Sequence, residues 1–102
     1  MIVREWRARA GRESASLYPR HFNDAVLPML RKLEGFVAGS LLSRIIDEHV
    51  EFLVMTRWDS LECIRGFAGP EIDKAVVEPA AAAALLSYDR TVQHYDVVDE
   101  AS

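Results

Sequence analysis

Two histidines stand where an imidazole could move a proton. His21 follows Tyr18 by about one turn in a segment with helical spacing, so its ring could accept a proton or orient the phenol. His94 lies within a strand-like segment, on the parity that is expected to be buried, with Arg4 or Tyr88 near it. We therefore take His21 and His94 as the candidate catalytic residues. The alternative for both is a structural histidine whose ring nitrogens are hydrogen-bonded within the fold.

Arg4 places a positive charge on a strand face that otherwise reads as buried. It shares its parity with Ile2 and Trp6, both of which are apolar. A buried arginine is rare unless it is paired, so Arg4 should either contact a carboxylate or bind an anionic ligand. The internal ion pair is the interpretation that we favour.

Aromatic side chains could line a cavity for a flat ligand. The residues predicted to contact such a ligand are Arg4, Trp6, Tyr18, Phe22, Trp58 and Phe67. Trp58 ends a predicted strand, where its ring could form a pocket wall and its N–H could find an acceptor. Ordinary core packing is the alternative for these aromatic residues. Cys63 is the single cysteine, and we expect it to behave as a small buried hydrophobe rather than as an activated thiol.

The elements that must position these residues follow from hydrophobic periodicity. Alternating or apolar runs predict strands at residues 2–10, 36–46, 49–58 and 89–98. Apolar residues at three-to-four spacing and helix-capping residues predict helical segments at 15–33, 59–67, 71–77 and 79–86. Pro28 should kink or restart the first helix, because it lacks a backbone N–H.

This order of elements is typical of a ferredoxin-like α+β domain. The predicted topology is βαββαβ with one antiparallel sheet of four strands, and residues 1–102 should form a single domain. In this topology the first and last strands are neighbours. The first strand is basic and the last is acidic, so charge pairs between them should support the pairing.

Both faces of the predicted sheet carry apolar residues. Leu53 and Met55 alternate with Val50, Phe52 and Val54 in the third strand, yet helices can cover only one face. An uncovered apolar face of this size is unusual in a soluble monomer, so we predict a homodimer of the dimeric α+β barrel type. The alternative is that the apolar residues are scattered and remain exposed.

Composition excludes several other classes of protein. The formal net charge is −4, and no cluster of Lys and Arg marks a nucleic-acid surface. No apolar run is long enough to span a membrane, and the first residues do not resemble a secretion signal, so we expect a cytoplasmic protein without membrane contact. A single cysteine allows no internal disulfide, and the His and carboxylate spacings predict no metal site.

Several motifs resemble the antibiotic biosynthesis monooxygenase-like group of the dimeric α+β barrel superfamily. The most specific is Thr56-Arg57-Trp58-Asp59-Ser60 leading to Phe67. The turn Leu33-Glu34-Gly35-Phe36 and the segment His94-Tyr95-Asp96-Val97 support the same resemblance, which extends over nearly the whole chain. The resemblance implies the fold and the homodimer, but not the activity, because the superfamily includes oxygenases, haem degraders, isomerases and proteins of unknown role.

The resemblance implies two functions from different classes. One is a cofactor-independent monooxygenase acting on a small phenolic or quinol substrate between the sheet and the helices. The other is a non-catalytic small-molecule-binding or stress-response domain of the same fold. The haem-degrading branch is disfavoured, since the first strand has no Asn, Phe67 replaces its second Trp, and Val76 and Val77 stand near the position of its His. We therefore expect no cofactor.

Overall fold

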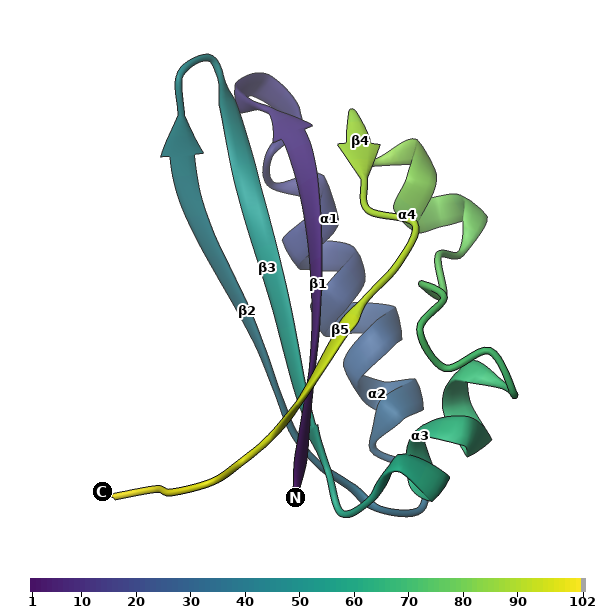
Figure 1. Cartoon of the computed structure of the whole chain (residues 1–102). Coiled ribbons are helices and arrows are strands. Elements are labelled where there is room, and N and C mark those ends of the chain that lie inside the picture. The colour runs from purple at the N-terminus through teal and green to yellow at the C-terminus, as the bar shows by residue number, and fades with distance from the viewer. Residues whose placement is uncertain (102) are drawn as a thin grey trace.

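The computed structural model describes residues 1–101, which form one antiparallel sheet covered on one face by helices (Figure 1). The strands are β1 (Ile2–Gly11), β2 (Phe36–Ile46), β3 (His49–Trp58), β4 (Ser87–Tyr88) and β5 (Gln93–Asp96). The spatial order is β2-β3-β1, and both β4 and β5 pair with β1 on its other side. The predicted ferredoxin-like α+β class is confirmed.

The last strand, predicted at 89–98, is shorter than expected, covering only Gln93–Asp96, and a separate two-residue strand, Ser87–Tyr88, precedes it. The chain leaves β1 between β4 and β5, where the Val92 N–H donates to the carbonyl of Asp73 and Thr91 forms an isolated bridge with Lys74. The sheet therefore has five strands rather than four. The predicted charge pairing at this edge is present, since Arg9 Nη1 lies 3.0 Å from Asp89 Oδ1.

The helical layer over the sheet follows β1 directly. It consists of a 3-10 turn η1 (Arg12–Ser14), α1 (Leu17–His21), a π-helical segment η2 (Phe22–Val26) and α2 (Leu27–Leu30). The predicted restart at Pro28 is confirmed, since Pro28 lies in the first turn of α2. Because Pro28 cannot donate a hydrogen bond, the α-helical bonding pattern is interrupted in the turn before it. There the Leu27 N–H bonds to the Phe22 carbonyl, which is the wider spacing of a π-helix.

The second crossover begins with α3 (Leu61–Ala68), capped by the Ser60 hydroxyl, which accepts from the Cys63 N–H. It then continues as an irregular strap, residues 69–78, and ends in α4 (Pro79–Ala83). The prediction of a helix at 71–77 was wrong. The backbone there bonds across to the C-terminal segment, as when the Ala75 N–H donates to the Arg90 carbonyl, so the strap is extended rather than coiled. The helix predicted at 79–86 stops at Ala83.

Two apolar clusters hold the helices on the inner face of the sheet. The first contains Ala10, Tyr18, Phe22, Phe52 and Ala81, and the second contains Ile2, Leu30, Trp58 and Ile64. Between them the register places Arg4 of β1 opposite Thr56 of β3 and His94 of β5. Within residues 1–101 no helix is long and apolar enough to cross a membrane.

Candidate functional site

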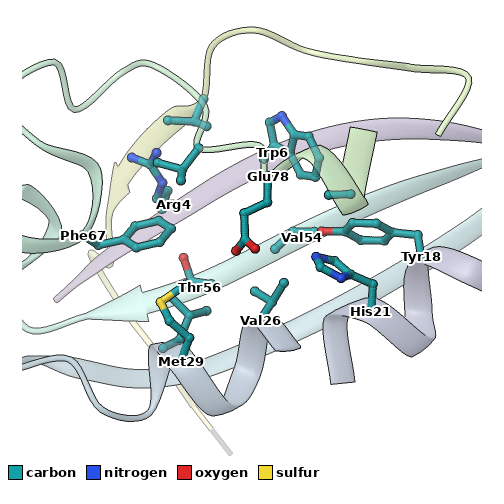
Figure 2. Close-up of a pocket in the computed structure, with 14 residues that line it drawn as sticks. Arg4, Trp6, Tyr18, His21, Val26, Met29, Val54, Thr56, Phe67 and Glu78 are labelled. Atoms are coloured by element: carbon teal, nitrogen blue, oxygen red, sulfur yellow. The ribbon is translucent and has the colours of Figure 1, made fainter. Parts of the chain in front are cut away.

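A pocket lies between the two apolar clusters, bounded by the inner face of the sheet, the α1–α2 layer and the strap (Figure 2). It contains about 620 Å³ of space between protein atoms, part of which is open to solvent. The lining residues are Arg4, Trp6, Tyr18, His21, Val26, Met29, Leu30, Val54, Thr56, Phe67, Val76, Glu78, Ala81 and Val92.

Five of the residues predicted from the sequence line this pocket. Arg4 and Phe67 lie at one end, Tyr18 and His21 at the other, and Trp6 forms part of the wall between them (Figure 2). The indole N–H of Trp6 donates to the Asp89 carbonyl at 2.7 Å, which fixes the orientation of its ring. The structure therefore brings together the predicted cation, one predicted histidine and three predicted aromatic residues.

The other three predicted residues lie behind the lining. Phe22 belongs to the first apolar cluster, and Trp58 is fully buried in the second. The Trp58 ring stacks on Phe67 with a centroid separation of 5.7 Å, and its N–H donates to Thr56 Oγ1 at 2.9 Å. Trp58 therefore supports two lining residues without lining the pocket itself. His94 also lies outside the lining, behind Arg4.

His94 connects Arg4 to the strap. Its Nε2 lies 2.9 Å from Arg4 Nη1, and its Nδ1 lies 3.2 Å from Asp73 Oδ1. Because a guanidinium only donates, Nε2 must accept, and the ring proton is then on Nδ1 and faces Asp73. Burial lowers the pKa of His94, and the nearby Arg4 charge lowers it further, while Asp73 opposes the shift. His94 is therefore held neutral with both ring nitrogens engaged.

Arg4 is bound by uncharged acceptors. Its Nη1 donates to the Ile72 carbonyl at 2.6 Å, and its Nη2 donates to the Lys74 carbonyl at 3.0 Å. The expected direct ion pair is wrong: no carboxylate in residues 1–101 lies within 4 Å of the guanidinium. Burial lowers the pKa of Arg4 to about 10, so the side chain remains a cation at neutral pH.

Tyr18 is a buried phenol at the opposite end of the pocket. Only 3% of the residue is exposed, and its ring packs on Phe52 with a centroid separation of 5.5 Å. Burial raises the pKa of Tyr18 to about 12, and the negative charge of Glu78 adds to this shift. At neutral pH the Tyr18 hydroxyl is therefore protonated and able to donate a hydrogen bond.

His21 carries the one buried side-chain polar atom in residues 1–101 that has no hydrogen-bond partner, namely Nε2. The imidazole lies against the Tyr18 ring at a centroid separation of 6.1 Å and borders the pocket (Figure 2). A buried nitrogen without a partner costs free energy, so such an atom is often the one that a ligand engages. His21 is therefore the available proton acceptor of this site.

Glu78 was not predicted from the sequence. Its carboxylate projects into the pocket between the Arg4 end and the Tyr18 end (Figure 2). The only sequence signal was its position directly before Pro79, where an acidic residue precedes a helix start. Thr56, Met29 and Val76 were also missed as lining residues, because their types are equally common in an ordinary core.

The pocket offers few side chains that could ligate a resident metal ion or a haem iron. Within residues 1–101 no group of three or more His, Cys, Asp or Glu side chains is arranged to hold a metal ion. Of the histidines near the pocket, His94 has both ring nitrogens engaged, which leaves His21 Nε2 as the nitrogen able to ligate. Val76 stands in the lining near the position where the haem-degrading branch has its histidine.

The fold and the pocket define a ferredoxin-like α+β protein with a partly open pocket between its sheet and its helices. No protein-family model matches the chain, and no curated protein matches its sequence. Solved structures match it over its whole length with sequence identities below 25%, which establishes a shared fold.

A candidate antibiotic biosynthesis monooxygenase from Deinococcus radiodurans has a TM-score of 0.65 at 16% identity, covering 100% of this chain and 97% of that one. MhuD, a heme-degrader from Mycobacterium tuberculosis with two hemes bound in its active site, has a TM-score of 0.62 at 21% identity, and the match covers 100% of both chains. SnoaB, a cofactor-independent oxygenase from Streptomyces nogalater, has a TM-score of 0.56 at 17% identity. The match covers 97% of this chain and 95% of that one. The resemblance inferred from the sequence motifs is thus confirmed for the fold.

Proposed function

We propose that this protein is a cofactor-independent monooxygenase that oxidises a small phenolic or quinol substrate in the pocket. The observation that carries the proposal is the buried, unpartnered Nε2 of His21 at the edge of an aromatic cavity. A general base must be free to accept a proton and must reach the substrate. His21 Nε2 has no hydrogen-bond partner and is therefore free, and the ring would have to turn to bring this enclosed atom to the pocket surface. The oxygenase activity stated for SnoaB, on the same fold, gives independent support.

The chemistry requires no group beyond the substrate, oxygen and a base. A ring CH₂ made acidic by a neighbouring carbonyl and phenol gives one proton to His21 Nε2. The resulting carbanion is oxidised by O₂, with formation of a C–O bond to a peroxide. The peroxide takes back the proton from His21, and loss of the second C–H proton together with hydroxide gives a carbonyl and one water. CH₂ and O₂ are thus converted to C=O and H₂O.

The remaining pocket residues suit this reaction. The Tyr18 hydroxyl is protonated and can donate to a substrate oxygen, which stabilises negative charge that develops on it. A substrate that filled the pocket would lie against aromatic side chains, where fewer water molecules could reach a carbanion. Glu78 lies at the strap, on the solvent-exposed side of the pocket.

Oxygen consumption with an anthrone-like substrate tests the proposal. His21→Leu should slow turnover by roughly 10²- to 10⁴-fold, the usual contribution of a general base. His49→Leu is the matched control, because His49 lies at the start of β3 beside the hairpin turn, outside the pocket lining, and should leave turnover unchanged. If wild type consumes no oxygen but is stabilised against heat by the same compound, the protein is a non-catalytic binder. A new visible absorption band on adding haem would instead indicate a haem protein.

We also propose that the chain works as a homodimer joined through the outer face of the sheet. Figure 1 shows that no helix covers this face of β2, β3 and β1. Leu42 and Leu53 are direct neighbours in the β2–β3 register, and Met55 lies two positions along β3 on the same face. Val3 and Tyr95 form a second apolar pair on this face, separated from the first by Arg7, Glu5 and Arg57. A second copy related by a two-fold axis would cover these apolar side chains with identical ones.

A further inference from the structure

The charge of Arg4 is not neutralised by the groups that touch it. The guanidinium is almost fully enclosed, with 5% of the residue exposed, and its contacts are the Ile72 and Lys74 carbonyls and the Nε2 of His94. All three acceptors are uncharged. Buried charges in proteins are normally paired with an opposite charge, because the loss of hydration is costly otherwise.

The carboxylates near the pocket do not supply that partner. Asp73 is the negative charge that acts on Arg4, but His94 stands between them and the Asp73 side chain is 80% exposed. Glu78 acts electrostatically on Tyr18 instead. Among residues 1–101, therefore, no carboxylate touches the Arg4 guanidinium, although Asp73 acts on it through His94 and Glu78 lines the same pocket.

Two N–H groups of Arg4 remain for a ligand. A guanidinium has five N–H groups, and three are used in the bonds to Ile72, His94 and Lys74. The two left over are on Nε and Nη2, which are bonded to the same carbon. Adjacent donors of this kind bind a carboxylate in two-point fashion or a phenolate in one-point fashion, and more strongly than they bind a neutral oxygen.

The surroundings of the guanidinium favour a flat ligand. The Phe67 ring lies under Arg4, with 5.6 Å between Cζ and the ring centroid, and Phe67 itself stacks on Trp58. Figure 2 shows Arg4 and Phe67 together at the end of the pocket opposite Tyr18 and His21. An aromatic ring bound between the two ends would place one substituent at Arg4 and its other edge near His21.

We infer that the pocket selects an aromatic ligand that carries an acidic oxygen, a carboxylate or a phenolate, and that Arg4 binds this oxygen. The inference rests on the proposed function only in placing the substrate in this pocket, and it concerns recognition rather than the oxidation step. His94 and Asp73 act as positioning residues, since they hold the guanidinium with its two unused N–H groups available.

Binding of two isosteric probes tests the inference. Calorimetric titration of the full chain with 2-naphthoate and with 2-naphthamide compares an acidic with a neutral head group on one ring system. Wild type should bind the carboxylate about tenfold more tightly, the difference expected between a charge-assisted and a neutral hydrogen bond. Arg4→Met should remove this preference, and Arg4→Lys should retain part of it, since Lys keeps the charge without the fork. Arg31→Met, which alters an exposed arginine directly after α2, is the matched control and should keep the full preference.

Titration of 2-naphthol tests whether Arg4 binds a phenolate as well as a carboxylate. If Arg4 binds its oxyanion, the absorption change that marks naphthol ionisation should move to lower pH on adding wild-type protein, but not on adding Arg4→Met. Equal binding of naphthoate and naphthamide by wild type would overturn the inference and leave the proposed function standing. Failure of all three probes to bind would overturn both. A preference unchanged in a folded Arg4→Lys and Arg4→Met protein would show that Arg4 is not the recognising group.

Discussion

His94 Nε2 and Arg4 Nη1 lie 2.9 Å apart across the β1–β5 pairing, and this contact exists only while the imidazole is neutral. Protonation of Nε2 would turn the acceptor into a donor and would set two positive charges against each other. The opposite ring nitrogen faces Asp73 on the strap. The protonation state of His94 therefore affects one of the contacts that attach the strap to the sheet.

The stability of the protein should fall in mildly acidic solution because of His94. Its pKa is lowered by burial and by Arg4, so the unfolded chain, in which the pKa is near 6.5, binds a proton more readily than the folded chain. The free energy of unfolding should therefore be constant above about pH 7 and should decrease as pH falls through 6.5 toward the lower folded value. Urea unfolding at pH 7.5 and pH 5.5 measures this difference.

Replacement of single histidines separates this effect from general acid destabilisation. His94→Gln keeps a hydrogen-bonding side chain that does not titrate, so the decrease between the two pH values should become smaller. His49→Gln should retain the wild-type decrease, because His49 lies at the hairpin away from Arg4. An identical decrease in wild type and His94→Gln would contradict the assignment.

Tyr18 should make the protein sensitive to alkali. Its pKa is raised to about 12 in the folded chain, first by burial and then by Glu78, whereas in the unfolded chain it is about 10. The unfolded chain therefore loses its phenolic proton first, and the free energy of unfolding should decrease as pH rises above about 10. Phenolic absorbance followed against pH should show one tyrosine that ionises last. Tyr18→Phe should remove that late step, whereas Tyr95→Phe, at a half-exposed position, should leave it in place.

Strand parity in the sequence predicts much of this site. Alternation in residues 2–10 places Arg4 on the same face as Ile2 and Trp6, and the structure has all three on the inner face. The same rule places His94 on a buried face, where Arg4 or Tyr88 was expected near it, and the structure shows a 2.9 Å contact with Arg4. Period-two patterns carry this information because a strand fixes the side-chain direction residue by residue.

The strap could not be predicted in the same way. Its sequence from Glu71 to Val77 has apolar residues at helical spacing, but its backbone groups bond to the C-terminal segment instead. Whether the backbone forms local helical hydrogen bonds or bonds to a distant segment depends on which segments lie close together in the fold. The periodicity of a sequence does not contain that information. The position of Glu78 in the pocket follows from the strap and was missed for the same reason. The carbonyl partners of Arg4 were not predicted either, because every residue type has a backbone carbonyl and the sequence does not distinguish the ones that accept.

Gly35 should not tolerate alanine, whereas Gly66 should. Gly35 has a φ of +80°, and an added Cβ would collide with the Cys63 side chain. The left-handed backbone alone costs roughly 1–2 kcal/mol for a residue with a Cβ, and the collision adds to this. Gly66 lies within α3 with nothing near an added Cβ, so alanine there should stabilise the protein by about 0.5–1 kcal/mol. Urea unfolding of both variants measures the two free energies, and changes of the same sign would contradict the turn geometry.

The proposed dimer should depend on Leu53. This side chain lies on the outer face in the middle of β3, with Leu42 opposite it on β2 and Arg7 opposite it on β1. In Leu53→Asp a carboxylate would be buried in the interface against its own copy, and pairing with Arg7 opposite it would also strip the hydration of that guanidinium, so the change is costly. Sedimentation equilibrium at micromolar concentration should give twice the 11.5 kDa chain mass for wild type and a single-chain mass for Leu53→Asp. Leu61→Asp is the control, because Leu61 is a partly exposed residue in the first turn of α3, where an acidic side chain is favourable. A single-chain mass for wild type, or an unchanged dimer in Leu53→Asp, would show that the outer face is not the interface.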